Sequence, residues 1–294
     1  MKPCVLALGF FDGVHLGHGG LLQKARRQAD ALGISAAALT FDRHPSSLIV
    51  GKATPLLNTA AERAGLMKRL YAMDEVCVLP FNEETRNLPW EQFAKNILLE
   101  EYGAKHLVCG HDYRFGKNGS GTPEKLEEFC KAQGIGFDCI PEIRLEGETV
   151  SSTLIRKLLS EGNVEKAARF LGHPHWLTGT VVDGRKVGRT LGVPTANLQT
   201  EGDILLPKQG VYAAKACFEG ESYPAVVNIG TRPTFEGSGV TIEPWLLDFS
   251  GDLYGKELRL EFYAFLREER KFSSPQELKE EVCRNAETAR KLLK

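Results

Sequence analysis

Two histidines near the start of the chain have the spacing and the setting of a phosphate-binding site. His15 and His18 occur in the segment GFFDGVHLGH, three residues apart, so they lie on one side of a first helical turn. Imidazoles there can donate hydrogen bonds to phosphate oxygens and to the charge that develops in a transition state. Gly13 and Gly17 let the backbone approach a ligand, and a helix N-terminus attracts anions. The segment therefore predicts the handling of nucleotide phosphates.

Two other interpretations of this histidine pair stay open. A zinc site needs a third Cys or His at a suggestive spacing, and the sequence offers none. A purely structural role is the other alternative. The common GxGxxG and GxxxxGK[ST] patterns do not occur, so the segment belongs to neither of those two nucleotide-binding classes.

A second candidate site is the glycine-rich, basic segment GRKVGRTLGVPTANL, residues 184–198. Backbone N–H groups of such a loop can cover a triphosphate, although an ordinary hairpin turn has a similar composition. The oxygens of Thr195 and Asn197 can bind Mg²⁺ beside those phosphates. No histidine follows His175, so proton abstraction in this half requires a carboxylate, a lysine or a tyrosine. The loop residues expected at the phosphates are Gly184, Gly188, Arg189 and Gly192.

The elements that must position the first site alternate between strands and helices. Short apolar runs typical of buried strands occupy residues 4–10, 34–42, 75–81, 105–110 and 135–143. Amphipathic helical stretches occupy residues 19–33, 60–73, 90–103 and 123–134. This alternation predicts an open parallel α/β sheet, in which ligands bind at the carboxyl ends of the strands. The histidine segment follows the first strand, which is the expected place.

The pattern changes after residue 150. One or two helices over residues 150–172 precede short alternating strands with frequent turn signals, which favours a small β-barrel. The strands are expected at residues 176–184, 210–220, 221–230, 240–249 and 256–268. A last helix is expected over residues 274–293. We place the domain boundary after Gly172, giving domains 1–172 and 173–294.

Composition limits the class of protein. A chain of 294 residues that is 42% apolar can form two buried cores. Its net charge is 37 − 38 = −1, which argues against a dedicated nucleic-acid binder. The first apolar run is too short for a membrane span, and it lacks the small-residue cleavage site of a signal peptide. Seven scattered cysteines without a CxxC pair suggest a reducing compartment. We expect a soluble cytoplasmic protein without nucleic-acid or membrane partners, and the sequence leaves open whether it forms homo-oligomers.

Four segments of the first half resemble one enzyme family in their order along the chain. They are GFFDGVHLGH, TFDRHP, GHDYRFG and VSSTLIR, within residues 5–172. Together they resemble the adenylyltransferase half of the bacterial bifunctional riboflavin kinase/FMN adenylyltransferase family. The resemblance implies a Rossmann-like nucleotidyltransferase domain that converts FMN and ATP to FAD and pyrophosphate.

The same resemblance implies roles for individual residues. His15 and His18 would bind ATP phosphates and stabilise the transition state, while Ser152, Thr153 and Arg156 would hold the departing pyrophosphate. Further residues at the ATP would be Gly9, Phe11, Gly13 and Gly17. Residues on the flavin side would be Asp42 and Asp112, whose alternative role is to form turns at strand ends.

The second half resembles the riboflavin kinase domain of the same family over residues 176–290, through PTAN, GVYAAK, VVNIGTRPTF and LLDFSGDLYGK. This implies a six-stranded Greek-key β-barrel with a terminal helix. Thr195 and Asn197 would bind Mg²⁺–ATP, and Glu243 would be the general base for the ribityl 5′-hydroxyl of riboflavin. Arg290 would either contact the flavin or be a solvated charge at the helix end.

The chain departs from the family pattern at a few positions. Phe10 stands where an Asn is usual, Gly119 where an Arg often follows, and Trp245 where a His is common. Pro244 cannot donate to a strand ladder, so it predicts a bulge or an edge strand beside Glu243. These departures keep two alternatives open, namely a monofunctional enzyme with one degenerate half and a flavin- or nucleotide-binding regulator without catalysis.

Overall fold

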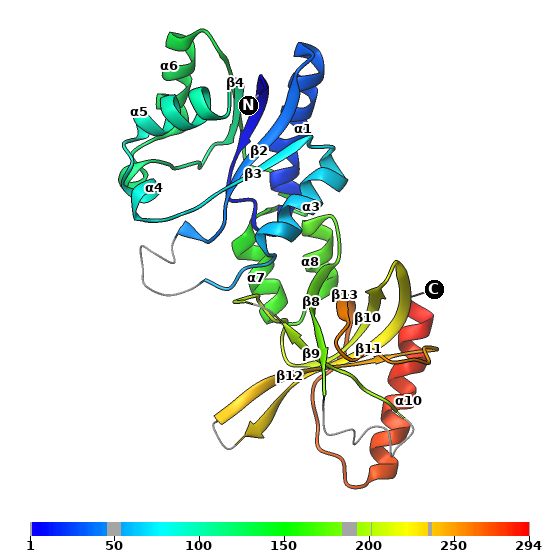
Figure 1. The fold of residues 1–294 in the computed structure, drawn as a ribbon. Helices are drawn as coiled ribbons and strands as arrows, with labels where there is room; N and C mark the ends of the chain where they lie inside the picture. Colours follow the sequence, from blue (N-terminus) through cyan, green and yellow to red (C-terminus); the bar gives the residue numbers. More distant parts are fainter. Residues whose placement is uncertain (1, 46–53, 184–192, 201, 235–236, 294) are drawn as a thin grey trace. The chain divides into compact units, whose positions relative to one another are not determined.

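The computed structural model describes residues 2–45, 54–183, 193–200, 202–234 and 237–293 (Figure 1). Contacts within the chain divide it into two compact units, Met1–Ser152 and Thr153–Lys294. Each unit has its own sheet. The N-terminal unit is of the α/β type, and the C-terminal unit is a β-barrel with helices at both ends of its sequence.

A five-stranded parallel sheet forms the N-terminal unit, with the strand order β3-β2-β1-β4-β5. Its strands are β1 (Cys4–Leu8), β2 (Ser35–Phe41), β3 (Glu75–Leu79), β4 (Ala104–Gly110) and β5 (Gly136–Ile140). This order confirms the predicted Rossmann-like class. The direction of winding reverses between β1 and β4, and ligands bind at the carboxyl ends of the strands beside such a reversal.

Helices connect these strands as the sequence pattern predicts. They are α1 (Leu16–Leu32), α3 (Ala60–Tyr71), α4 (Glu83–Asn87), α5 (Trp90–Gln92) and α6 (Pro123–Gln133), with the 3₁₀ turns η1 (Asp12–Val14) and η3 (Lys117–Gly119). Residues 93–101 differ from expectation, because they form the π-helix η2 (Phe93–Glu101), in which the Tyr102 N–H donates to the Ile97 carbonyl over 3.0 Å. A short hairpin, β6 (Arg144–Leu145) and β7 (Glu148–Thr149), ends the unit.

The core of the N-terminal unit lies on both faces of its central strand. Every residue of β1 is buried, which is typical of a parallel strand covered by helices on both sides. One face packs Leu6 and Leu8 against Leu107, Phe93 and Phe115. The strand end that carries the histidine segment is therefore anchored in a rigid, fully covered sheet.

The C-terminal unit is a six-stranded antiparallel barrel with the order β12-β11-β10-β13-β8-β9. Its elements are α7 (Ser152–Ser160), α8 (Val164–Leu171), β8 (His175–Val182), β9 (Asn197–Thr200), β10 (Gly210–Phe218), β11 (Glu221–Thr234), β12 (Gly237–Leu246), β13 (Glu257–Arg267) and α10 (Pro275–Leu292). Strand β13 returns beside β10, which gives the predicted Greek-key arrangement. The Ala196 N–H donates to the Pro244 carbonyl over 2.9 Å and links the two edges.

Helix α10 packs against β10 and β11 of the barrel (Figure 1). Ser274 caps its first turn by accepting the Glu277 N–H, and Pro275 follows as the first helical residue. Farther along, Ala286 and Ala289 lie in one buried cluster with Val211 of β10. The start of α10 and the strand ends near it form the wall of a cavity.

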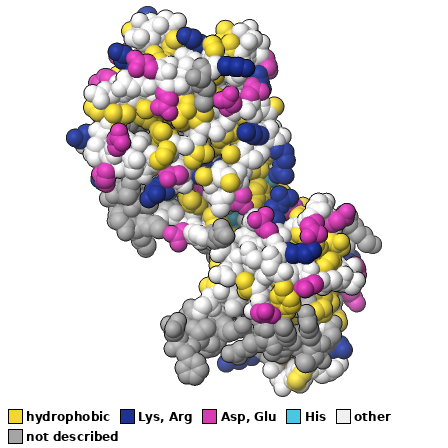
Figure 2. Space-filling view, in the orientation of Figure 1, with side chains coloured by type: hydrophobic (Ala, Val, Ile, Leu, Met, Phe, Trp, Pro, Cys, Tyr) yellow, Lys and Arg dark blue, Asp and Glu magenta, His cyan; other side chains and the backbone are white. Residues whose placement is uncertain are grey.

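The surface carries both signs of charge. Figure 2 shows acidic and basic side chains interspersed over the visible face of the described residues. In the described part of the chain, no helix is long and apolar enough to cross a membrane.

Candidate active sites

The turn between β1 and α1 has a strained backbone. Phe11 and Val14 adopt the left-handed conformation, with φ of 57° and 43°, although neither is glycine. Each such residue costs on the order of 1–3 kcal/mol, and the conformation persists only where the surrounding structure imposes it. Both side chains are fully buried, and the Val14 N–H donates to the Phe11 carbonyl over 2.9 Å. Strain of this kind is common at ligand sites.

Residues distant in sequence hold this turn in place. The Thr40 hydroxyl donates to the Phe10 carbonyl over 2.7 Å, and the Leu57 N–H donates to Asp12 Oδ1 over 3.0 Å. The Ser152 hydroxyl donates to the Asp12 carbonyl over 2.9 Å. The structure therefore places Ser152, a predicted phosphate ligand, directly beside the turn.

A buried arginine that the sequence analysis missed also supports the turn. Arg63 of α3 is fully buried, and its guanidinium donates to the Phe10 carbonyl over 2.6 Å and to the Phe41 carbonyl over 2.8 Å. It also lies 4.2 Å from the centre of the Phe10 ring. Burial lowers the pKa of Arg63, against the attraction of Asp12. The signal in the sequence is its position in the apolar stripe of its helix, three residues before Leu66.

The two histidines stack on each other at the N-terminus of α1. His15 is the N-cap residue, and its Nδ1 accepts the His18 N–H over 3.2 Å. Because Nδ1 accepts, the proton of a neutral His15 ring is on Nε2, which makes Nε2 a donor. The two ring centres are 3.6 Å apart and nearly parallel. Gly17 permits this, since a Cβ there would lie 3.0 Å from the His15 ring.

His18 has the features of a group awaiting a ligand. Its Nδ1 is buried and has no hydrogen-bond partner among the described residues. Burial lowers its pKa well below the usual value, and the nearby His15 and Arg63 lower it further. His18 is therefore neutral at pH 7 in the free protein. An unpartnered buried nitrogen is unfavourable by about 1–3 kcal/mol, which a bound ligand can recover.

The predicted flavin residues of the N-terminal unit lie at the same edge of the sheet. Asp42 follows β2, where its Oδ1 accepts the Phe81 N–H over 2.8 Å and its Oδ2 lies 3.5 Å from Arg43 Nε. Asp112 follows β4 and is exposed. Both positions suit strand-end turns as well as a ligand contact, so their flavin role stays a prediction.

The remaining residues predicted for the N-terminal site fall into two groups. Gly9 lies directly before the turn, where a Cβ would approach the Phe11 ring to 3.0 Å. Thr153 and Arg156 lie in the first turns of α7, the former exposed and the latter half-buried. Their part in phosphate binding stays a prediction.

The C-terminal unit contains a cavity of about 350 Å³, within the range of about 300–1,000 Å³ typical of small-molecule sites. The cavity is lined by residues of β10, β11, β12 and β13, of the segment before β9, of the segment between β13 and α10, and of α10 itself. They are Val193, Thr195, Val211, Val226, Asn228, Glu243, Trp245, Arg267, Glu269, Arg270, Phe272, Leu278, Lys279, Val282 and Asn285. The cavity thus brings together two residues predicted separately, Thr195 and Glu243.

Glu243 lies on a regular part of β12. It pairs with Asn228 of β11, and the β11–β12 register continues without a bulge from Thr234↔Gly237 to Ala225↔Leu246. Trp245, two residues on, points to the same cavity. Pro244 lies between them, its carbonyl bound to the Ala196 N–H at the edge of the sheet. The edge position, not a bulge, accommodates the proline.

The predicted metal ligands lie beside this strand. The hydrogen bond from Ala196 to Pro244 joins the segment before β9 to β12, and Thr195 lines the same cavity as Glu243. Asn197 begins β9 opposite Val182. The predicted loop residues Gly184, Gly188, Arg189 and Gly192 are outside the described residues. Within the described ranges, no group of three or more His, Cys, Asp or Glu side chains is arranged to hold a metal ion.

Some charged residues of the cavity escaped the sequence analysis, and one predicted residue lies elsewhere. Arg267, Glu269 and Arg270 come from the segment LREERKF, whose dense charge looks like a solvated surface. Arg290, the predicted flavin contact, makes two hydrogen bonds to Asp248, of 2.7 and 3.2 Å, and is not one of the residues lining the cavity.

Comparisons with known proteins agree with this two-site architecture. A family described as FAD synthetase matches residues 1–154, and a family described as riboflavin kinase matches residues 171–293. A bifunctional riboflavin kinase/FMN adenylyltransferase from Listeria monocytogenes is 37% identical over 92% of this chain and 86% of its own. The protein of the same name from Pseudomonas fluorescens is 36% identical over 99% and 93%, respectively.

A solved structure has the same fold. A crystal structure described as a macrolide-efflux protein from Streptococcus pneumoniae has a TM-score of 0.89 and 29% sequence identity, covering 98% of this chain and 94% of its own. Enzymes of the two matched families use ATP, typically with a divalent metal ion. With one matched family in each half and full-length relatives above 30% identity, this chain belongs to the bifunctional riboflavin kinase/FMN adenylyltransferase family.

Proposed function

We propose that the two reactions of this bifunctional enzyme take place at two separate sites. Riboflavin is phosphorylated by ATP to FMN in the barrel, and FMN is adenylylated by ATP to FAD and pyrophosphate at the β1–α1 turn. The observation that supports the barrel site most strongly is that Glu243 and Thr195 line one cavity of suitable volume. The unpartnered, buried Nδ1 of His18 at a helix N-terminus supports the other site.

In adenylyl transfer, an FMN phosphate oxygen attacks the α-phosphorus of ATP and pyrophosphate leaves. His15 and His18, together with the N–H groups that open α1, stabilise the charge on the phosphate oxygens. Gly9, Phe11, Gly13 and Gly17 shape the backbone around the ATP. Ser152, Thr153 and Arg156 bind the departing pyrophosphate, and Asp42 and Asp112 contact the flavin side. Positioning and electrostatics suffice, without a covalent intermediate.

In the kinase reaction, Glu243 accepts the proton of the ribityl 5′-hydroxyl as that oxygen attacks the γ-phosphorus and ADP leaves. The cavity beside Glu243 holds the flavin ring. Gly184, Gly188, Arg189 and Gly192 cover the ATP phosphates through backbone N–H groups. Arg290 is a further flavin contact that we propose.

The divalent ion is Mg²⁺, held by the oxygens of Thr195 and Asn197. The donor set fits, because neutral oxygens near a substrate phosphate suit Mg²⁺, which keeps several waters and binds few protein ligands. When bound, the ion neutralises charge on the ATP phosphates.

The two domains are residues 1–172 and 173–294, acting on small molecules in the cytoplasm without nucleic-acid or membrane partners. Seven free cysteines, several of them buried, support a reducing compartment.

Product analysis tests the proposal. The purified protein is incubated with ATP, Mg²⁺ and either riboflavin or FMN, and the flavins are separated by chromatography. Wild-type protein should give FMN and FAD from riboflavin, and FAD from FMN. Glu243→Gln should give no FMN from riboflavin and normal FAD from FMN. Normal FMN formation by Glu243→Gln would overturn the assignment of the base.

A further inference from the structure

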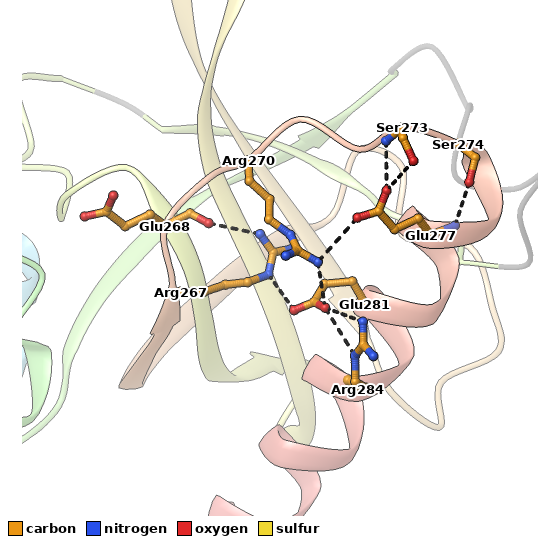
Figure 3. Close-up of polar contacts among 8 residues, drawn as sticks. All are labelled: Arg267, Glu268, Arg270, Ser273, Ser274, Glu277, Glu281 and Arg284. Carbon is orange, nitrogen blue, oxygen red and sulfur yellow. Dashed lines mark hydrogen bonds and ion pairs between the residues drawn. The ribbon is translucent and has the colours of Figure 1, made fainter.

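Three arginines converge on one carboxylate behind the cavity of the barrel. Figure 3 shows Arg267, Arg270 and Arg284 pointing toward Glu281 of α10. Arg284 Nη2 and Arg270 Nη2 lie 2.6 and 3.0 Å from Glu281 Oε2, and Arg267 Nε lies 3.4 Å from Oε1. Both carboxylate oxygens are thus engaged by guanidinium groups from three different positions of the chain.

The arginines differ in what else they touch. Arg267 and Arg270 line the cavity, whereas Arg284 does not. The first two also lie over the Phe272 ring, with guanidinium carbons 5.5 and 4.9 Å from its centre. Glu281 itself is not a lining residue, so its contact with a ligand in the cavity would run through these arginines.

Two members of this cluster are largely buried, whereas Arg270 and Arg284 are more exposed. The side chains of Glu281 and Arg267 are 16% and 19% exposed, so solvent screens their attraction weakly. Without the carboxylate, two neighbouring guanidinium groups would repel each other and turn toward solvent. Glu277 holds Arg270 more loosely, at 3.8 Å, and its carboxylate accepts two hydrogen bonds from Ser273, just before the helix (Figure 3).

We propose that Glu281 is a positioning residue for the kinase reaction, whose carboxylate holds Arg267 and Arg270 at the cavity wall in the orientation that receives the flavin ring. A fixed, planar guanidinium can stack on an aromatic ring system and donate to its carbonyl oxygens. This role rests on the proposed function, in which the cavity beside Glu243 binds the flavin.

The test compares Glu281→Gln with Arg284→Ala in the full-length protein. Glu281→Gln removes the carboxylate from all three arginines, whereas Arg284→Ala removes one ion pair and leaves the two arginines of the cavity wall bound to Glu281. Steady-state FMN formation gives kcat and KM for riboflavin and for ATP, and FAD formation from FMN serves as the internal reference. Fluorescence titration gives the Kd of riboflavin directly.

Glu281→Gln should raise both the KM and the Kd of riboflavin roughly tenfold, because the charge-assisted contacts that hold the two guanidinium groups at the cavity wall are lost. The KM of ATP and the rate of FAD formation should stay unchanged. Arg284→Ala should stay within about twofold of wild type in all constants, and Glu281→Asp should recover most of the riboflavin affinity.

Equal changes in Glu281→Gln and Arg284→Ala would overturn the positioning role, as would an unchanged riboflavin KM. If Glu281→Gln does not fold, Arg270→Gln removes one wall guanidinium while Glu281 stays paired, and the same rise is expected. An active Glu243→Gln variant would instead overturn the flavin site itself, so the two failures are distinguishable.

Discussion

The β1–α1 turn of the N-terminal unit and strand β12 of the barrel carry their functional side chains in opposite ways. In the turn, Phe11 and Val14 are strained, and buried groups from other parts of the chain hold them. On β12, Glu243 lies in an unbroken ladder with ordinary strand geometry. A turn held by few contacts should be sensitive to the loss of any one of them, and a ladder should tolerate changes between its functional residues. The following predictions test that difference.

Arg63→Met should have the largest effect. It removes the buried guanidinium that donates to the Phe41 carbonyl and leaves the Phe10 carbonyl with the Thr40 hydroxyl as its donor. The free energy of unfolding of the N-terminal unit should therefore fall by about 2–4 kcal/mol. FAD formation should fall at least tenfold, and FMN formation should persist. Urea unfolding and the two activity assays measure these effects.

Arg69→Met is the matched control for this change, since Arg69 is exposed on the same helix. It should change the free energy of unfolding by less than about 0.5 kcal/mol. Equal urea midpoints for the two variants would show that the buried guanidinium does not support the turn.

Gly17→Ala tests the position of His15. A Cβ at residue 17 would lie 3.0 Å from the His15 ring and 3.1 Å from the Val150 carbonyl oxygen, so the ring must move. The kcat of FAD formation should fall roughly tenfold, because displaced catalytic groups lose their alignment. A Cβ added at Gly65 of α3 would meet nothing within 4 Å. Gly65→Ala should therefore stabilise the protein by up to about 1 kcal/mol and leave FAD formation at the wild-type rate. Equal kcat values of FAD formation in Gly17→Ala and Gly65→Ala would contradict a role for the position of His15.

The pH dependence of stability tests the burial of His18. Its pKa in the folded protein lies well below 6.5, so below about pH 6.5 the unfolded chain binds a proton that the folded protein does not. Stability therefore falls as the pH decreases from 7 toward 5, by at most about 1.4 kcal/mol per pH unit from this group. His18→Asn should flatten that slope, whereas the exposed control His111→Asn should not. Identical slopes of stability against pH in wild type and His18→Asn would refute the burial of His18.

Pro244→Ala should have the smallest effect. The proline lies at the edge of the sheet, where its carbonyl already accepts from Ala196, so an added N–H changes no ladder bond. The KM of riboflavin and the kcat of FMN formation should stay within about twofold of wild type. A tenfold loss would mean that Glu243 depends on the proline as strongly as His15 depends on its surroundings.

The sequence predicted the secondary structure of both units but not the charged residues that support the two sites. Apolar periodicity located the five parallel strands and most of the barrel, because burial on a face repeats along the chain. It missed β9, which is four residues long and too polar to show alternation. It also missed Arg63 and Glu281, since an arginine or a glutamate on an amphipathic helix normally faces solvent. Their burial depends on partners such as Phe10 and Arg267 that only the fold brings near.

The most direct test of two separate sites is complementation between two full-length variants. His18→Ala should make FMN but no FAD from riboflavin, and Glu243→Gln should make FAD only from added FMN. A mixture of the two proteins with riboflavin, ATP and Mg²⁺ should then produce FAD, because FMN released by the first variant reaches the intact N-terminal site of the second. A mixture that forms FMN but no FAD, while the Glu243→Gln protein converts added FMN normally, would contradict independent sites. Loss of both reactions in either single variant would contradict them as well.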